Sequence, residues 1–78
     1  MSYAIVRIVW NDAFAETSSW IEVDSIDDKP CEVTSVGFLI PEAKKDHVVL
    51  AQSVNVEESI DSVLMIPVAM IVSTELLS

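Results

Sequence analysis

Two tryptophans are the residues of this sequence best suited to holding another molecule. Trp10 and Trp20 border the polar segment 11–19, and a tryptophan beside a loop can anchor a partner or stack on a flat ring. Trp20 shares its expected strand face with Glu22 and Asp24, so we expect its ring to point away from the core. Ile21 and Val23, on the other face of that strand, are expected to face the core. Trp10 has two open interpretations, as a ligand platform or as a plug at the end of the core.

Arg7 is the second kind of candidate. It shares an expected strand face with Ile5 and Val9, and an arginine among aliphatic side chains needs an acidic neighbour or a bound anion as its partner. We therefore predict a ligand-binding set composed of Arg7, Trp10, Asn11, Trp20, Ser35 and Gly37.

Groups that could catalyse a reaction are scarce. A nucleophile needs an adjacent base, and the chain has one histidine, His47, and one cysteine, Cys31. We expect His47 to be an ordinary surface or edge residue and Cys31 to be a small buried hydrophobe. The paired acidic residues are loop neighbours, which is typical of solvated faces, and a single glycine cannot build a phosphate-cradling loop. The prediction is a binding protein without catalytic residues, metal or cofactor.

Chain length and composition predict self-association. The 78 residues make a single domain, 1–78, which on its own has marginal stability. One cysteine allows no intrachain disulfide, and 51% of the residues are hydrophobic. Some of this apolar surface is therefore expected to meet another copy of the chain in a homo-oligomer.

The charge is strongly acidic. Thirteen acidic residues against four basic ones give a formal net charge of −9, which argues against binding to duplex nucleic acid. The acidity has two open explanations: solubility, or a partner with a basic surface, including mimicry of nucleic acid. No apolar run reaches the roughly 18 residues of a membrane span, and the N-terminus lacks a signal-peptide pattern. We expect a cytoplasmic protein that does not contact a membrane.

Short runs of valine, isoleucine and threonine predict strands. Turn-forming residues separate these runs. Asn11-Asp12 is the turn predicted after the first run, and Pro67 ends a later one. Gly37, the only glycine, lies inside an expected strand, where it allows a bend, the close approach of another backbone, or a ligand passing over it. The pattern fits an all-β, five- to six-stranded SH3-like or Sm-like barrel with a 3₁₀ turn before the last strand. The expected strands are 3–10, 20–24, 31–40, 47–54, 62–67 and 71–76, with the 3₁₀ turn at 68–70.

The order of several short motifs resembles a family of small proteins encoded by tailed bacteriophages. The motifs cover most of the chain and read Arg7-Ile-Val-Trp10-Asn-Asp-Ala13, Ser19-Trp20, Val33-Thr-Ser-Val-Gly-Phe-Leu-Ile40, Val48-Val-Leu-Ala-Gln-Ser53 and Ile66-Pro67-x-x-Met70-Ile71.

The resemblance implies an anti-defence factor in the host cytoplasm. Small phage proteins of this kind include oligomeric sponges that sequester cyclic oligonucleotides or cyclic ADP-ribose isomers without turnover. This chain departs from the family at Val68, where related sequences carry a basic residue after the Ile-Pro pair. Two alternatives stay open: an acidic module that inhibits a basic host protein, and a minor virion or assembly component.

Overall fold

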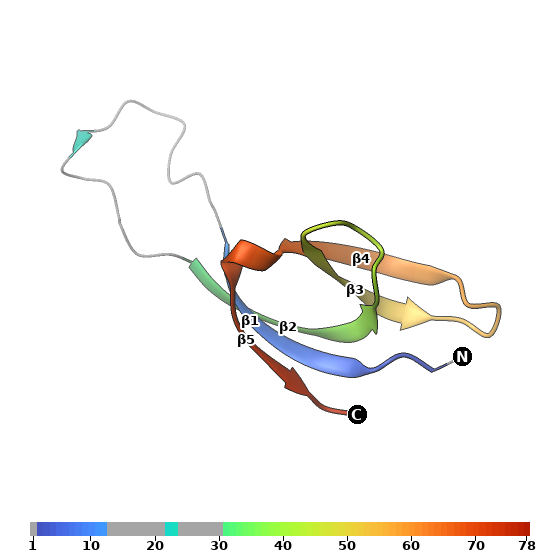
Figure 1. Ribbon diagram of the computed structural model, residues 1–78. Helices are drawn as coiled ribbons and strands as arrows, with labels where there is room; N and C mark the ends of the chain where they lie inside the picture. Colours follow the sequence, from blue (N-terminus) through green and yellow to red (C-terminus); the bar gives the residue numbers. More distant parts are fainter. Residues whose placement is uncertain (1, 13–21, 24–30) are drawn as a thin grey trace.

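The fold is a single antiparallel sheet (Figure 1). The computed structural model describes residues 2–12, 22–23 and 31–78, and five strands lie within these ranges in the order β4-β3-β2-β1-β5. The elements are β1 (Ile5–Asp12), β2 (Cys31–Ile40), β3 (His47–Val54), β4 (Ile60–Pro67), the 3₁₀ helix η2 (Val68–Met70) and β5 (Ile71–Leu76). The predicted all-β class and the 3₁₀ turn before the last strand are confirmed. Among the described residues no ladder joins β4 to β5, so the sheet is open.

Strand boundaries agree with the sequence pattern at β2, β3 and β5 and differ at β1 and β4. The Asn11-Asp12 pair, predicted to be a turn, continues β1 because it pairs with Glu32 and Cys31 of β2. Strand β4 begins at Ile60, two residues earlier than predicted. In both places a neighbouring strand supplies ladder partners to residues with low intrinsic strand preference, namely Asn11, Asp12 and Asp61, and this pairing outweighs the local signal.

The short strand expected at 20–24 falls largely outside the described residues. The two described positions, Glu22 and Val23, are not in a strand. Val23 is 80% exposed, so the expectation that it faces the core was wrong.

The sheet is strongly curved (Figure 1), and the core lies on one side of it. Val6 and Ile8 of β1 cluster with Leu50 of β3 and Ile66 of β4, each at most 3% exposed. Strand β1 thus buries Val6 and Ile8 and exposes Arg7 between them, in agreement with the alternation of faces predicted for this strand. Curvature brings β3 and β4 toward β1, although β2 separates them in the sheet order.

Strand β2 joins the two halves of the sheet. It pairs with β1 from Cys31 to Phe38 but with β3 only from Phe38 to Ile40. The first part of β2 therefore belongs to the β1-β5 half, and its last residues also belong to the β3-β4 half. The change occurs next to Gly37.

Gly37 allows the backbone of β3 to approach closely. It is buried, and a Cβ atom built on it would lie 2.9 Å from the carbonyl oxygen of Ala51 and 3.3 Å from the Cβ of Leu50. Real Cβ atoms do not approach a backbone oxygen this closely. Of the explanations considered for this glycine, close approach of another backbone is therefore confirmed.

The helix η2 is tied to the connection between β2 and β3. The N–H of Val68 donates to the carbonyl oxygen of Asp46 at 3.0 Å, and both Glu42 and Asp46 have positive φ angles in that connection. Pro67, which has no N–H to donate, precedes η2 as predicted. Among the described residues no helix has the length and apolar character needed to cross a membrane.

Replacing Gly37 with alanine should destabilise the fold. The added methyl group must displace the backbone of β3 or the side chain of Leu50, and overpacking of this kind costs about 1–3 kcal/mol. For a domain of this size each 1 kcal/mol lowers Tm by roughly 4–8 °C, and Gly37→Val should cost more. Thermal unfolding followed by circular dichroism measures the effect, with exposed Val36→Ala as control. An unchanged Tm in both glycine variants would contradict the steric role.

Candidate ligand-binding hollow

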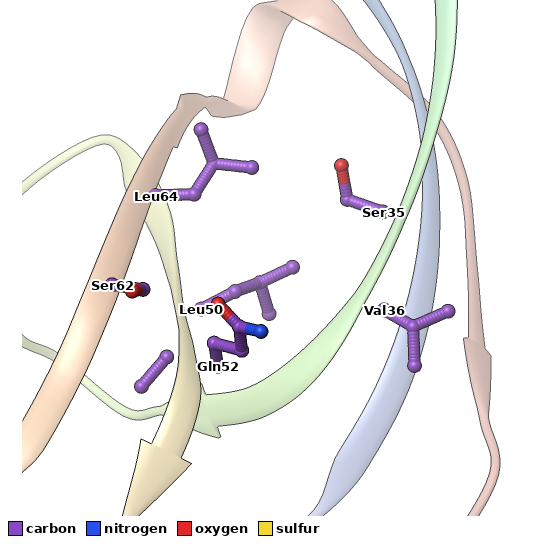
Figure 2. Close-up of a pocket in the computed structure, with 7 residues that line it drawn as sticks. Ser35, Val36, Leu50, Gln52, Ser62 and Leu64 are labelled. Carbon is purple, nitrogen blue, oxygen red and sulfur yellow. The ribbon is translucent and has the colours of Figure 1, made fainter.

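A hollow of about 310 Å³ opens between β2, β3 and β4 (Figure 2). Its volume is at the lower end of the range of roughly 300–1,000 Å³ typical of small-molecule sites. The residues that line it are Ser35, Val36, Leu50, Ala51, Gln52, Ser62 and Leu64.

The lining combines an apolar base with uncharged polar groups. Leu50 is buried in the core and Leu64 packs against that core. Figure 2 shows Leu64 and Ser62 on β4 and Ser35 on β2, on either side of Leu50 and Gln52 of β3. Hydroxyl and amide groups both donate and accept hydrogen bonds, so the hollow can recognise a neutral polar ligand that has an apolar face. Within the part of the chain that the structure describes, none of its lining residues is charged.

Ser62 gives the hollow its irregular edge. Its φ angle is 55°, a left-handed conformation that residues other than glycine seldom adopt. The β3-β4 ladder pairs Ala51 with Val63 and Ser53 with Asp61, and it omits the intervening pair of Gln52 and Ser62. The N–H of Ser62 donates instead to the Asp61 side chain, Oδ1, at 2.9 Å. Backbone strain of this kind concentrates at functional sites.

Trp10 lies beside the hollow and not inside it. Its indole Nε1–H donates to Ser35 Oγ at 3.0 Å, and the pair is partly buried. The tryptophan also packs against the core cluster. Of the two interpretations left open by the sequence, a structural role at the end of the core fits these contacts, and the bond fixes the position of the Ser35 hydroxyl.

Arg7 lies on the other face of the sheet. Its guanidinium is paired with the carboxylate of Glu75 on β5, directly across the ladder. An acidic neighbour was one of the two partners predicted for this arginine. Because β1 alternates its faces, Arg7 cannot join Trp10 and Ser35 in one site within a single chain.

The remaining predicted residues are distributed as follows. Asn11 is partly buried opposite Glu32 near the end of β1. Gly37 is buried against β3, where the Ala51 carbonyl fills the space that a ligand would need. Trp20 lies outside the described residues. The predicted set is therefore not gathered in one place, and only Ser35 belongs to the hollow.

Gln52, Ser62 and Leu64 were missed by the sequence analysis. The sequence did contain a signal for Gln52, because it is a polar residue on the inward face of β3. It follows Val48 and Leu50 at a spacing of two, and those two residues pack in or against the core. The positive φ of Ser62 had no such signal in the sequence.

Titratable groups do not form a reactive cluster in the described ranges. No group of three or more potential metal ligands occurs there. His47 Nδ1 lies 2.8 Å from the carbonyl oxygen of Lys45, consistent with an ordinary edge residue. Cys31 is exposed, so the prediction that it is buried was wrong. It begins β2 opposite Asp12, beyond the core residues of both strands.

A second hollow lies near the first described residues. It has a volume of about 280 Å³ and contains two aromatic side chains, Tyr3 and Phe38, together with residues of the β3-β4 turn. Its lining residues are Ser2, Tyr3, Phe38, Val54, Asn55 and Val56.

No protein family, curated protein or solved structure matches this chain.

Replacing Ser35 with alanine should remove the acceptor for the Trp10 indole. Losing a partly buried hydrogen bond costs about 0.5–1.5 kcal/mol, and the freed N–H should change the tryptophan emission spectrum. Urea unfolding followed by fluorescence measures both effects. Ser53→Ala, at an exposed position of β3, is the control. Equal losses of stability in the two variants would contradict a specific role for the Trp10–Ser35 bond.

Proposed function

We propose that the protein is a non-catalytic binding protein that sequesters a small cyclic nucleotide immune signal, with the nucleoside part held in the hollow between β2, β3 and β4. The observation that carries the proposal is the uncharged polar rim above an apolar base, built from Ser35, Gln52 and Ser62 over Leu50 and Leu64. The motif order that resembles small phage proteins supports the class of ligand.

The shape of the hollow favours one flat, polar ring system. A volume near 310 Å³ is small for a whole cyclic dinucleotide but suits one base with part of its sugar. A base can pack its faces on leucine side chains, because apolar surface is removed from water. The Gln52 amide can pair with donors and acceptors on the base edge, as glutamine does with adenine, and serine hydroxyls can bond to ribose hydroxyls.

The charge distribution limits how the phosphates are held. No basic residue lines the hollow among the residues that the structure describes. Arg7 is on the opposite face of the sheet, where it is paired with Glu75. Phosphate groups would therefore remain near solvent or meet basic residues of another copy. This is consistent with Val68 at the position where the phage proteins that the sequence resembles carry a basic residue.

The finer fold and the assembly belong to the same proposal. The curved sheet and the 3₁₀ turn before β5 suit a small SH3-like or Sm-like barrel. We expect it to act as a homo-oligomer in the host cytoplasm, as an anti-defence factor without enzymatic turnover, metal or cofactor. Trp20 remains a candidate stacking residue on sequence grounds alone.

Isothermal titration calorimetry with a panel of cyclic dinucleotides, cyclic trinucleotides and cyclic ADP-ribose isomers tests this function. Gln52→Ala should weaken binding of the cognate ligand about tenfold, the equivalent of ~1.4 kcal/mol, because its amide contacts are lost. Ser53→Ala is the matched control, since it is the next residue in β3 and lies on the opposite face. Absence of binding across the panel, or equal effects of the two variants, would overturn the assignment.

The second candidate is an acidic interaction module, and the hydrogen bonds within the β3-β4 turn support it. Asn55 Oδ1 accepts hydrogen bonds from the backbone N–H groups of Glu57 and Ser59 at 3.0 and 2.9 Å. Glu57 is thereby presented on a fixed turn, and acidic groups can steer a protein to a basic surface. A host protein captured from lysate and released by high salt would favour this candidate.

A further inference from the structure

The open sheet has two edge strands, β4 and β5, and they differ in how well they are protected. Unpaired strand edges are templates for pairing with another chain, and proteins blunt them with charges, prolines and irregular backbone. The difference between the two edges indicates which one is available for association.

Strand β4 carries several of these protective features. Asp61 places a charge near its start, Ser62 breaks its regular geometry with a φ angle of 55°, and Pro67 at its end lacks an N–H. A second chain could not form a regular ladder along this edge.

Strand β5 is less protected. Its ladder with β1 has one irregularity, a register shift that leaves Val72 without a partner, and its one charged residue is Glu75. The strand contains no proline and no residue with positive φ. Its apolar side chains are widely exposed, with Val72 at 56% and Leu76 at 69%. Figure 1 shows β5 at the edge of the sheet with β1 as its only labelled neighbour.

The hydrogen bonds to β1 show which backbone groups of β5 are free to pair. The N–H of Leu77 donates to the Ile5 carbonyl oxygen at 2.8 Å. In an antiparallel strand, the backbone N–H and C=O groups of successive residues point alternately toward and away from one neighbouring strand. Since the N–H of Leu77 points toward β1, the backbone groups of Thr74 and Leu76 point away from it. Their side chains lie on the core side of the sheet, since Thr74 is opposite Ile8 and Leu76 is opposite Val6.

Charge does not oppose contact at this edge. Glu75 is the only charged residue of β5, and the guanidinium of Arg7 neutralises it. In a chain with a formal net charge of −9, this edge is locally neutral. Two copies can therefore approach here with little repulsion between like charges.

We propose that β5 is the self-association edge and pairs antiparallel with β5 of a second copy about a two-fold axis at Thr74. The order Val72, Thr74, Leu76 is self-complementary about its centre: each Thr74 meets its symmetry mate, and Val72 of one copy meets Leu76 of the other. Such a contact is isologous, and it continues the apolar row beyond Val6. This proposal deepens the self-association part of the proposed function and is independent of the ligand.

Disulfide trapping tests the geometry directly. In a Cys31→Ser background, Thr74→Cys should cross-link rapidly under mild oxidation, because paired residues at such positions have Cα atoms ~5.5 Å apart, within disulfide range. Val63→Cys in the same background is the control, exposed on β4, and should remain uncross-linked. Cross-linking of Val63→Cys to itself would overturn the β5 pairing. Cross-linking that occurs only when the Thr74→Cys and Val63→Cys variants are mixed would also overturn it.

Light scattering on the ligand-free protein provides a second measurement. The wild-type chain should have twice the 8.6 kDa mass of one copy. Leu76→Lys should shift it to a monomer with little change in Tm, whereas Val63→Lys should leave the dimer intact. A monomeric wild-type protein would refute the pairing but leave ligand binding standing, whereas a dimer that binds no nucleotide would refute only the proposed function.

Discussion

The close contact of β2 and β3 at Gly37 is the constraint on which the rest of the sheet depends. With no Cβ on Gly37, the carbonyl of Ala51 can approach to a distance that any other residue would prevent. This contact draws β3, and β4 with it, over the inner face of β1, so that Leu50 and Ile66 reach Val6 and Ile8. The hollow is a consequence of the same contact, because Leu50, Ala51 and Gln52 continue directly from it along β3.

Much of the fold could be predicted from the sequence because local and tertiary preferences agree. The alternation of β1 and the proline before η2 each have one dominant physical cause, and the structure shows the expected outcome. The sequence left several explanations open for Gly37, and the structure shows the close approach of another backbone. The predictions failed where pairing with a neighbouring strand determines the local structure. Asn11 and Asp12 have turn preferences but find partners in β2, and Cys31 begins its strand beyond the reach of the core.

The candidate site was less predictable for two reasons. Arg7 and Trp10 were assigned to one site although an interval of three places them on opposite faces of a strand; that separation could have been inferred from the alternation alone. Ser62 could not have been found in this way. Its positive φ arises from the tertiary irregularity between β3 and β4, and serine has no local preference for that conformation.

The two faces of the sheet therefore have different features. The inner face offers a neutral polar hollow, and the outer face uses Arg7 to neutralise the only charge of β5. We propose that the hollow on the inner face holds a nucleoside. Titration of the ¹⁵N-labelled protein with cyclic nucleotides, followed by NMR, tests it most directly. The largest shifts should occur at the amides of Ser35, Gln52 and Ser62. Shifts confined to Arg7 and Glu75, or no shifts with any cyclic nucleotide, would contradict it.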